Sequence, residues 1–371
     1  MKMKEKIHGV NLGNWLVLEK WMHKDLFAGV DAEDETDLCQ MLPRKELERR
    51  LTQHRDTYIT KEDFIWIAKH GVNVIRIPVP HFIFGDNPLY CEPYVACISY
   101  LDKAFEWAEE TGLQILIDLH TVPESQNGFD NGGICGVCKF HQNPEIVDRV
   151  IQVLGMLSAR YAKHTALWGI EILNEPISED LWEIIRHRYL PKDKERAKGS
   201  SFIPLQFLYE FYERAYAEIR KYLSEDKVVM FHDGFRPKAW KEFMQDKEKY
   251  KNVWLDTHIY IGMSPPERAK ELEDLVSLVM KDYKKDIEEM AKYFPVVVGE
   301  WCLSHSRKGL ADLSKWEQHL SYRAVADAQL YAWDASAGYF FWSYKLVSAP
   351  DGWDFRDNIN KNRFPENVSE I

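Results

Sequence analysis

The amino-acid sequence predicts an α/β protein, built as a single (β/α)8 TIM barrel over residues 1–371 with long loops over its C-terminal face. Short apolar runs recur along the 371 residues, and amphipathic stretches with helical spacing separate them. Runs such as Ile115-Leu116-Ile117 are apolar on both faces, which indicates parallel strands covered by helices. No linker or shift in composition divides the chain, so one large barrel fits its length better than two domains.

The repeats can be placed along the chain in order. Eight strands are expected over residues 7–12, 73–78, 114–119, 167–173, 228–232, 252–258, 295–299 and 338–342. Helices are expected between the strands, for example over residues 61–70, 98–111, 144–163, 204–222, 268–293 and 313–334. A strand followed by a helix, eight times, is the pattern of a closed barrel.

An open doubly wound sheet is the rival architecture. It would need a glycine-rich, phosphate-binding turn between the first strand and a helix. Here Gly9-Val10-Asn11-Leu12-Gly13 leads into Trp15 instead. The sequence therefore favours the barrel.

Charge and aromatic content narrow the class of partner. The net charge is −11, with 48 Lys and Arg against 59 Asp and Glu, which disfavours binding to nucleic acid or to an anionic membrane. No stretch approaches the roughly 18 apolar residues of a membrane span. The chain holds 13 Trp, 18 Tyr and 18 Phe, flat apolar plates of the kind on which sugar rings stack. We expect an uncharged partner, neither nucleic acid nor membrane.

The N-terminus and the cysteines favour a cytoplasmic location. Residues 1–6 are charged and precede no apolar export segment; the chain would be secreted if a signal had been removed. Six cysteines are too few for a disulfide scaffold, so reduced thiols are expected. Cys135, Cys138 and His141 have the spacing of zinc ligands, but a structural zinc needs about four ligands and no second pair lies nearby. Loop thiols are favoured over a metal site or a redox pair, and no cofactor is expected.

Polar residues close most of the apolar runs, where a barrel of this kind carries its functional side chains. They are Arg76, Asp118, His120, Asn174, Glu175, Asp256, His258, Tyr260 and Glu300. Asp118 or Asp256 alone could be an ordinary strand end. Glu175 and Glu300 continue strands that are apolar on both faces and lie across the barrel mouth from each other, which favours the paired carboxyls of glycoside hydrolysis.

Two other classes of barrel fit less well. A metal-dependent barrel hydrolase that used His120 and His258 would usually add a His-x-His pair after the first strand, and none is present. A sugar-binding barrel without activity would be signalled by loss of Glu175 or Glu300, and both are present.

These residues, with Trp342, resemble glycoside hydrolase family 5 in order and in strand placement. The resemblance covers about residues 7 to 358, and several motifs are closest to the exo-β-1,3-glucanase branch. The motifs are Gly9-Val10-Asn11-Leu12-Gly13-Asn14-Trp15-Leu16-Val17-Leu18-Glu19, Ser125-Gln126-Asn127-Gly128-Phe129-Asp130-Asn131, Leu173-Asn174-Glu175-Pro176, Phe231-His232-Asp233-Gly234-Phe235 and Phe341-Trp342-Ser343-Tyr344-Lys345.

The resemblance implies a retaining β-glycosidase that acts by double displacement. It implies that Glu175 is the acid/base and Glu300 the nucleophile. Arg76 and Tyr260 would hold Glu300, and His258 would lie near Glu175.

The same resemblance implies a set of substrate-binding residues. Asn174 would bind the 2-hydroxyl of the sugar being cleaved. Trp342 would form the floor of the innermost sugar site, with Glu19 and His120 gripping hydroxyls and Asp130 nearby. Residues 121–124 and 21–24 depart from the usual pattern of the branch, which leaves the substrate open.

Loop lengths favour exo action. About 48 residues separate the first predicted strand from residue 61, about 24 lie between His120 and Pro144, and nearly 30 follow Trp342. They carry aromatic residues that would wall off a blind pocket for a terminal glucosyl unit: Trp15, Trp21, Phe129, Tyr344 and Trp353. The basic segment 186–198 is expected to be a solvated surface excursion.

We therefore expect an exo-β-1,3-glucanase or β-glucosidase that acts on short β-glucans or β-glucosides. The alternatives that remain are an endo-β-glucanase, a β-mannan-active enzyme and a transglycosylase.

Overall fold

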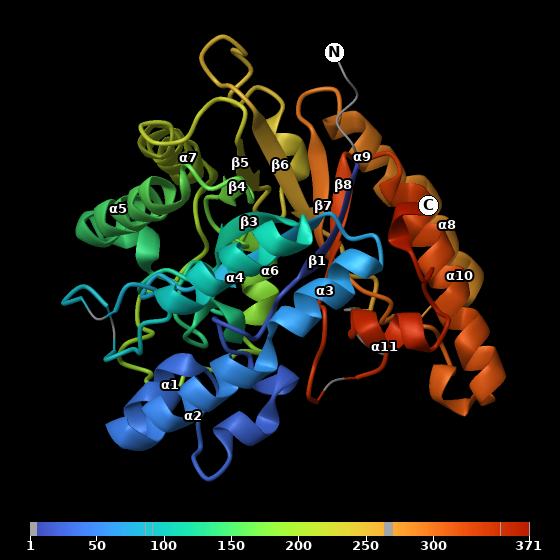
Figure 1. The fold of residues 1–371 in the computed structure, drawn as a ribbon, viewed down its shortest axis with the longest axis horizontal. Helices are drawn as coiled ribbons and strands as arrows, with labels where there is room; N and C mark the ends of the chain where they lie inside the picture. The colour runs from blue at the N-terminus through green and yellow to red at the C-terminus, as the bar shows by residue number, and fades with distance from the viewer. Residues whose placement is uncertain (1–5, 86, 91, 263–269, 349, 371) are drawn as a thin grey trace.

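A computed structural model describes residues 6–85, 87–90, 92–262, 270–348 and 350–370. Eight parallel strands form a closed barrel in which each strand pairs with the next and β8 pairs with β1 (Figure 1). This confirms the predicted fold class. The strands are β1 Ile7–Asn11, β2 Val74–Val79, β3 Gln114–Leu119, β4 Leu167–Glu171, β5 Val228–His232, β6 Val253–His258, β7 Val296–Trp301 and β8 Gly338–Phe341.

Helices surround the barrel, with α5 and α7 on one side and α8 to α10 on the other (Figure 1). They are α3 Lys61–Lys69, α4 Ile98–Thr111, α5 Pro144–Tyr161, α7 Leu205–Ile219, α8 Leu272–Ser277, a π-helical stretch Leu278–Tyr283, α9 Lys284–Met290 and α10 Lys315–Trp333. The predicted helix over 268–293 is thus three segments, and its first two residues lie outside the described ones. Among the described residues, no helix combines the length and apolarity that crossing a membrane requires.

The strict alternation of strand and α-helix does not hold. Between β5 and β6 the only helical segment is the 3-10 turn Pro237–Trp240. The long connections instead contain helices that were not predicted: α1 Glu35–Met41, α2 Arg44–Tyr58, α6 Glu179–Ile185 and α11 Phe355–Asn360. Helix α2 escapes a periodicity search because most of its residues are polar and its apolar face is narrow, with Leu47 and Leu51 buried.

Several strand ends differ from the prediction by one or two residues, and two of these differences matter for the site. Strand β4 ends at Glu171, two residues early, although the Ile172 amide still donates to the Met230 carbonyl of β5 at 2.9 Å. Strand β7 continues through Trp301, since Glu300 pairs with His258 of β6 and Trp301 with Phe341 of β8. Glu300 is therefore held within the sheet, while Glu175 lies in the turn after its strand.

The interior of the barrel has an apolar layer and a polar layer. Large side chains from the first residues of the strands fill the N-terminal half: Ile7, Val74, Leu116, Trp168, Val228, Met230, Trp254, Val297 and Phe340. Gly9 leaves room for this plug, since a Cβ there would lie 2.2 Å from the Phe340 ring. Nearer the C-terminal ends the interior is fully buried and charged, with Arg76, Asp118, Glu171 and Asp256.

Helix α3 binds the segment that follows β8, through contacts of Asp63 with Tyr344 and Lys345. Asp63 caps its own helix by accepting a hydrogen bond from the backbone amide of Thr60 at 2.9 Å. It also accepts one from the Tyr344 hydroxyl at 2.8 Å and binds the ammonium of Lys345 at 2.8 Å. Asp63 is buried, so these partners replace water around its charge.

The Asp63→Ala variant should lose about 3 kcal/mol of the free energy of unfolding, because a helix cap and a buried charge pair are lost together. Urea denaturation followed by tryptophan fluorescence measures the loss. The matched control is Glu62→Ala, at an exposed position on the same helix turn, which should change stability by less than about 0.5 kcal/mol. Equal stability of the two variants would show that Asp63 does not fasten this segment.

Candidate active site

A cavity of about 1730 Å³ opens at the C-terminal ends of the strands. Seven residues predicted from the sequence line it: Glu19, Asp130, Glu175, His258, Tyr260, Glu300 and Trp342. Three others, Arg76, His120 and Asn174, are fully buried and do not line it. The predicted residues thus divide into a wall that faces the cavity and a layer that supports this wall.

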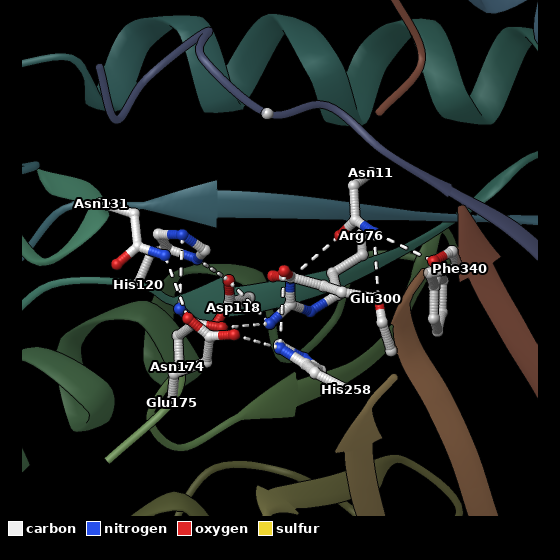
Figure 2. A network of polar contacts seen from close by, with 12 residues as sticks. Asn11, Arg76, Asp118, His120, Asn131, Asn174, Glu175, His258, Glu300 and Phe340 are labelled. Carbon is white, nitrogen blue, oxygen red and sulfur yellow. Dashed lines mark hydrogen bonds and ion pairs between the residues drawn. The ribbon is translucent and has the colours of Figure 1, made fainter. Parts of the chain in front are cut away.

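Glu175 and Glu300 lie close together at the bottom of the cavity (Figure 2). The Nδ1 atom of His258 lies 2.8 Å from Oε1 of Glu175 and 3.4 Å from Oε2 of Glu300. Because one nitrogen lies near both oxygens, these oxygens are at most about 6 Å apart. Inverting glycosidases separate their carboxyls by roughly 6.5 to 9.5 Å and retaining ones by about 5 to 5.5 Å.

The backbone of Glu175 is strained. Its φ is 46°, in the left-handed region that residues other than glycine rarely adopt. Such a conformation costs on the order of 1 kcal/mol or more and persists where the surroundings impose it. Here Asn131 donates a hydrogen bond of 3.0 Å to Oε2, and His258 contacts Oε1. The strain directs this carboxyl at the cavity.

Glu300 is held by two donors. Arg76 donates from Nη1 to Oε1 at 3.0 Å, and the Tyr260 hydroxyl donates to Oε2 at 2.7 Å. Arg76 is in turn fixed by Asn11, Glu171 and Asn174. Both donors favour the ionised carboxylate.

His258 bridges the two halves of the site. Its Nδ1 faces Glu175, and its Nε2 lies 3.0 Å from Asp256. Burial alone would lower the pKa of His258, but Glu300, Asp256 and Glu175 raise it well above its usual value. With carboxylates at both nitrogens, the ring is an imidazolium that donates to both.

The two carboxyls facing this imidazolium differ in pKa. Burial raises the pKa of Glu175, but the hydrogen bond and the charge of His258, with the hydrogen bond from Asn131, together lower it below its usual value. Burial also raises the pKa of Glu300. The charge of His258 lowers this pKa and the charge of Glu175 raises it, and the resulting pKa lies above the usual 4.5. The proton of the free site therefore resides on His258.

A second pair of acidic side chains lies across the cavity. Burial, and then Asp130, raise the pKa of Glu19 well above its usual value, and burial raises the pKa of Asp130 to about 6. Trp21 donates a 2.8 Å hydrogen bond to Oε2 of Glu19, while Oε1 has no partner among the described atoms. This free oxygen suits a ligand hydroxyl.

Trp342 and His120 form a stacked pair. Their ring centroids are 5.6 Å apart and their planes differ by 10°. Trp342 lines the cavity, whereas His120 lies behind it and bonds to Asp118 at 2.6 Å. His120 therefore supports Trp342 from behind, and its expected grip on sugar hydroxyls stays a prediction.

The loop aromatics divide in the same way. Trp21, Phe129 and Trp353 line the cavity as expected. Trp15 and Tyr344 do not, because they are buried in the core, where they donate to the Arg55 carbonyl and to Asp63 respectively.

Sequence reasoning underrated several supporting residues. Asp118 and Asp256, each interpreted as a possible ordinary strand end, are fully buried partners of His120 and His258. Glu171, inside the fourth predicted strand, pairs with Arg76 at 2.7 Å and was missed. The signal that could have identified Glu171 is a charged residue within a run that is apolar on both faces. The contact of Asn131 with Glu175 was not predicted either, although Asn131 belongs to one of the motifs.

The basic segment after β4 is more than a surface excursion. Arg186, His187 and Arg188 are exposed, as expected. However, Arg188, Tyr189 and Leu190 line the cavity. The segment therefore forms part of its mouth.

Two groups of side chains have atoms close enough to hold a metal ion, Glu175 with His232 and His258, and Glu171 with Asp256 and His258. His258 belongs to both, and its nitrogens lie 2.8 and 3.0 Å from their carboxylate partners. Those are hydrogen-bond distances between the imidazole and each carboxylate. The donor set fits proton transfer better than metal binding.

The cysteines are buried free thiols at the five described positions, Cys39, Cys97, Cys135, Cys138 and Cys302. Cys91 lies outside the described residues. Burial raises the pKa of Cys135 and of Cys138 above the usual range, so both remain neutral thiols. Neutral thiols are poor metal ligands.

Comparison with known proteins identifies the family. The sequence model of cellulase (glycosyl hydrolase family 5) matches residues 44–345. The chain is 32% identical to a probable glucan 1,3-beta-glucosidase A of Emericella nidulans over 99% of this chain and 91% of that protein. It is 28% identical to the sporulation-specific glucan 1,3-beta-glucosidase of Saccharomyces cerevisiae, over 99% of this chain and 87% of that protein.

Solved structures share the fold. The rutinosidase from Aspergillus niger superposes with a TM-score of 0.79 at 22% identity, covering 97% of this chain and 98% of that one. A lichenase of the same family from Caldicellulosiruptor superposes with a TM-score of 0.58 at 16% sequence identity, covering 95% of this chain and 87% of that one. From the match of its sequence over most of its length, this chain belongs to glycosyl hydrolase family 5 and is a glycoside hydrolase.

Proposed function

We propose that this enzyme is a retaining, exo-acting β-glucosidase or exo-β-1,3-glucanase. The observation that carries the proposal is the placement of Glu175 and Glu300 on either side of one His258 nitrogen, with oxygens at most about 6 Å apart. That spacing leaves no room for the water of an inverting enzyme. The relatives named as glucan 1,3-beta-glucosidases support the choice of a β-1,3-linked glucosyl substrate.

The proposed reaction has two steps. Glu300 attacks the anomeric carbon and forms a glycosyl ester, while Glu175 protonates the leaving oxygen. Water then attacks the ester with Glu175 as the base, and Glu300 leaves. Each turnover consumes one water and releases one glucose.

The proton for the first step comes from His258 in this scheme. His258 holds it 2.8 Å from Oε1 of Glu175 in the free site. As the leaving oxygen takes up a proton, the imidazolium proton passes to Glu175 and from Glu175 to that oxygen, so Glu175 ends the first step ionised and His258 ends it neutral. In the second step Glu175 takes the proton of the attacking water and passes it back to His258. Arg76 and Tyr260 keep Glu300 ionised for attack.

The sugar-binding part of the proposal uses the remaining predicted residues. Trp342 presents a flat apolar face, and Glu19 and Asp130 offer oxygens to hydroxyl groups. In Asn174, Oδ1 accepts from Arg76 and the amide NH2 lies 3.4 Å from Nε2 of His120, and we propose that this NH2 binds the 2-hydroxyl of the bound sugar. A neutral sugar suits this pair of acids, whereas a phosphorylated or acidic sugar would be repelled.

Support for exo action comes from the long connection after β1. It folds into α1 and α2, which Figure 1 shows at the end of the barrel opposite the N-terminus. Trp21 from this connection meets Trp353 from the last one, with ring centroids 5.1 Å apart. Trp353 also lies 5.2 Å from Tyr260. These contacts close the cavity wall on that side and favour a pocket over an open groove.

Short glucosides or oligosaccharides in the cytoplasm are the substrates we propose, and the free thiols agree with a reducing compartment. Endo action, activity on β-mannan and transglycosylation are the competing outcomes of the experiments below.

Replacement of either carboxyl should abolish most hydrolysis. Glu300→Ala should reduce kcat by at least about 10⁴-fold on any glucoside, because no ester can form. Glu175→Ala should cost about 10² to 10⁴-fold on alkyl glucosides and far less on dinitrophenyl glucoside, whose leaving group needs no proton. Added azide should yield an α-glucosyl azide with Glu300→Ala and a β-glucosyl azide with Glu175→Ala, identified by NMR. Near-normal turnover by either variant would remove the assignment.

The dependence of kcat/KM on pH should be bell-shaped. Glu300 must be ionised to attack, and its pKa is raised, so activity should fall as the pH drops through a value above 4.5. His258 must hold its proton, and its pKa is raised, so activity should fall again as the pH rises through a value above 6.5. His258→Asn should remove this alkaline limb or shift it to lower pH.

The control for this profile is His319→Asn on α10, away from the cavity, which should leave both limbs in place. An unchanged alkaline limb in His258→Asn would show that another group supplies the proton.

Products from a linear β-1,3-glucan oligomer should show where the enzyme cuts. A closed pocket predicts glucose at the earliest time points, seen by time-resolved chromatography. Fragments of middle length appearing first would mean endo action, and products longer than the substrate would mean transglycosylation. Parallel runs with β-1,4-mannan oligomers test the remaining alternative, and no cleavage is expected there.

A further inference from the structure

We propose that the leaving-group side of the cavity is an apolar aglycone site, so that β-glucosides of apolar alcohols are substrates of this enzyme. The inference rests on the proposed function, because it takes Glu175 as the acid that protonates the leaving group. It adds the chemical class of the group that leaves.

The cavity is larger than one sugar requires. Ligand pockets for small molecules are typically about 300 to 1,000 Å³, and this one is about 1730 Å³. The innermost residues Glu19, Glu300 and Trp342 account for a single glucosyl unit. We infer that the remaining volume holds the leaving group that is attached to this glucosyl unit.

One wall of this remaining volume is aliphatic and open to solvent. It consists of Leu181, Ile184 and Ile185 of α6, followed by Leu190. Ile184 is 68% exposed and Leu190 is 66% exposed. Branched aliphatic side chains offer neither a hydrogen bond nor a flat face to a sugar ring. Gathered at a cavity mouth, they are typical of a surface that an apolar ligand covers.

This wall lies on the acid side of the site. Asn131 donates to Glu175, and the neighbouring Phe129 ring lies 5.2 Å from the ring of Tyr189, which precedes Leu190. Helix α6 itself begins four residues after Glu175. An oxygen protonated by Glu175 therefore carries its substituent toward Ile184 and Leu190.

A second apolar surface continues from the same side. The Phe235 ring lies 5.1 Å from His232, whose ring lies 4.3 Å from His258. Four buried core residues, Leu255, Ile287, Met290 and Val296, also line the cavity. These four side chains are apolar and belong to β6, α9 and β7.

The charged residues that line this side are Asp130, which interacts with Arg188, together with Asp233 and Asp286. Arg188 is exposed to water. An alkyl or aryl group that lies against Ile184 and Leu190 covers apolar side chains that are otherwise in water. Hydrolysis of such a substrate consumes one water and releases glucose and the free alcohol.

Octyl and methyl β-D-glucoside provide the test, because their leaving alcohols are similar in basicity and differ in apolar length. Each methylene that becomes buried should raise kcat/KM by about fourfold. We expect octyl glucoside, kept below its micelle concentration, to exceed methyl glucoside in kcat/KM by at least about 50-fold, which corresponds to three buried methylenes.

The variant Ile184→Asn/Leu190→Asn should reduce this octyl-to-methyl ratio by at least about fivefold and leave methyl glucoside hydrolysis unchanged. Both positions are exposed, so the fold should be retained. The matched control is Ile65→Asn on α3, which is 52% exposed and does not line the cavity, and which should leave the ratio at its wild-type value.

A wild-type ratio within about twofold of one, or an unchanged ratio in the double variant, would overturn the aglycone site. Laminaribiose, measured in parallel, separates this failure from failure of the proposed function. Cleavage of laminaribiose without an octyl preference would reject only the aglycone site. A strong octyl preference without laminaribiose cleavage would reject the β-1,3-glucan substrate and support the aglycone site.

Discussion

The polar half of this barrel depends on one buried guanidinium. Arg76 is fully buried on β2 and contacts Asn11 of β1, Asp118 of β3, Glu171 of β4 and Glu300 of β7. A buried cation must be surrounded by anions and acceptors, or its desolvation costs several kcal/mol. Each of these strands must therefore supply a polar side chain at the same level. The catalytic carboxyl of β7 is one of them.

The balance of charge around Arg76 also determines what Glu300 can do. Burial raises the pKa of Glu171 well above its usual value, and the charge of Arg76, 2.7 Å away, counteracts this. Asp118 and Asp256 are each paired with a histidine, His120 and His258. The guanidinium, which also contacts Asp118, stabilises Glu300 as an anion. The imidazolium of His258 lies nearer to Glu175 than to Glu300. Arg76 keeps the nucleophile Glu300 ionised, and His258 carries the proton for the leaving group.

The amino-acid sequence predicted the barrel well, because strand and helix periods are local and the strands are buried on both faces. It also found the residues that end the strands, since polar groups there interrupt apolar runs. What escaped prediction depends on long-range packing. That His120 supports Trp342 from behind follows from their stacking across the barrel, and that Trp15 and Tyr344 are in the core follows from partners on α2 and α3. Helices α1 and α2 were hidden because a polar loop and a polar helix have nearly the same composition.

The central claim is that Glu300 forms a covalent bond to the sugar, with Glu175 close enough to act on the same bond. A 2-deoxy-2-fluoro-β-glucoside with a dinitrophenol leaving group forms this ester quickly and hydrolyses it slowly, so the intermediate accumulates. Protease digestion and mass spectrometry of the inactivated enzyme then locate the sugar. The account predicts one fluoroglucosyl group per chain, on the peptide that contains Glu300. A label on Glu175, or turnover without any covalent label, would contradict it.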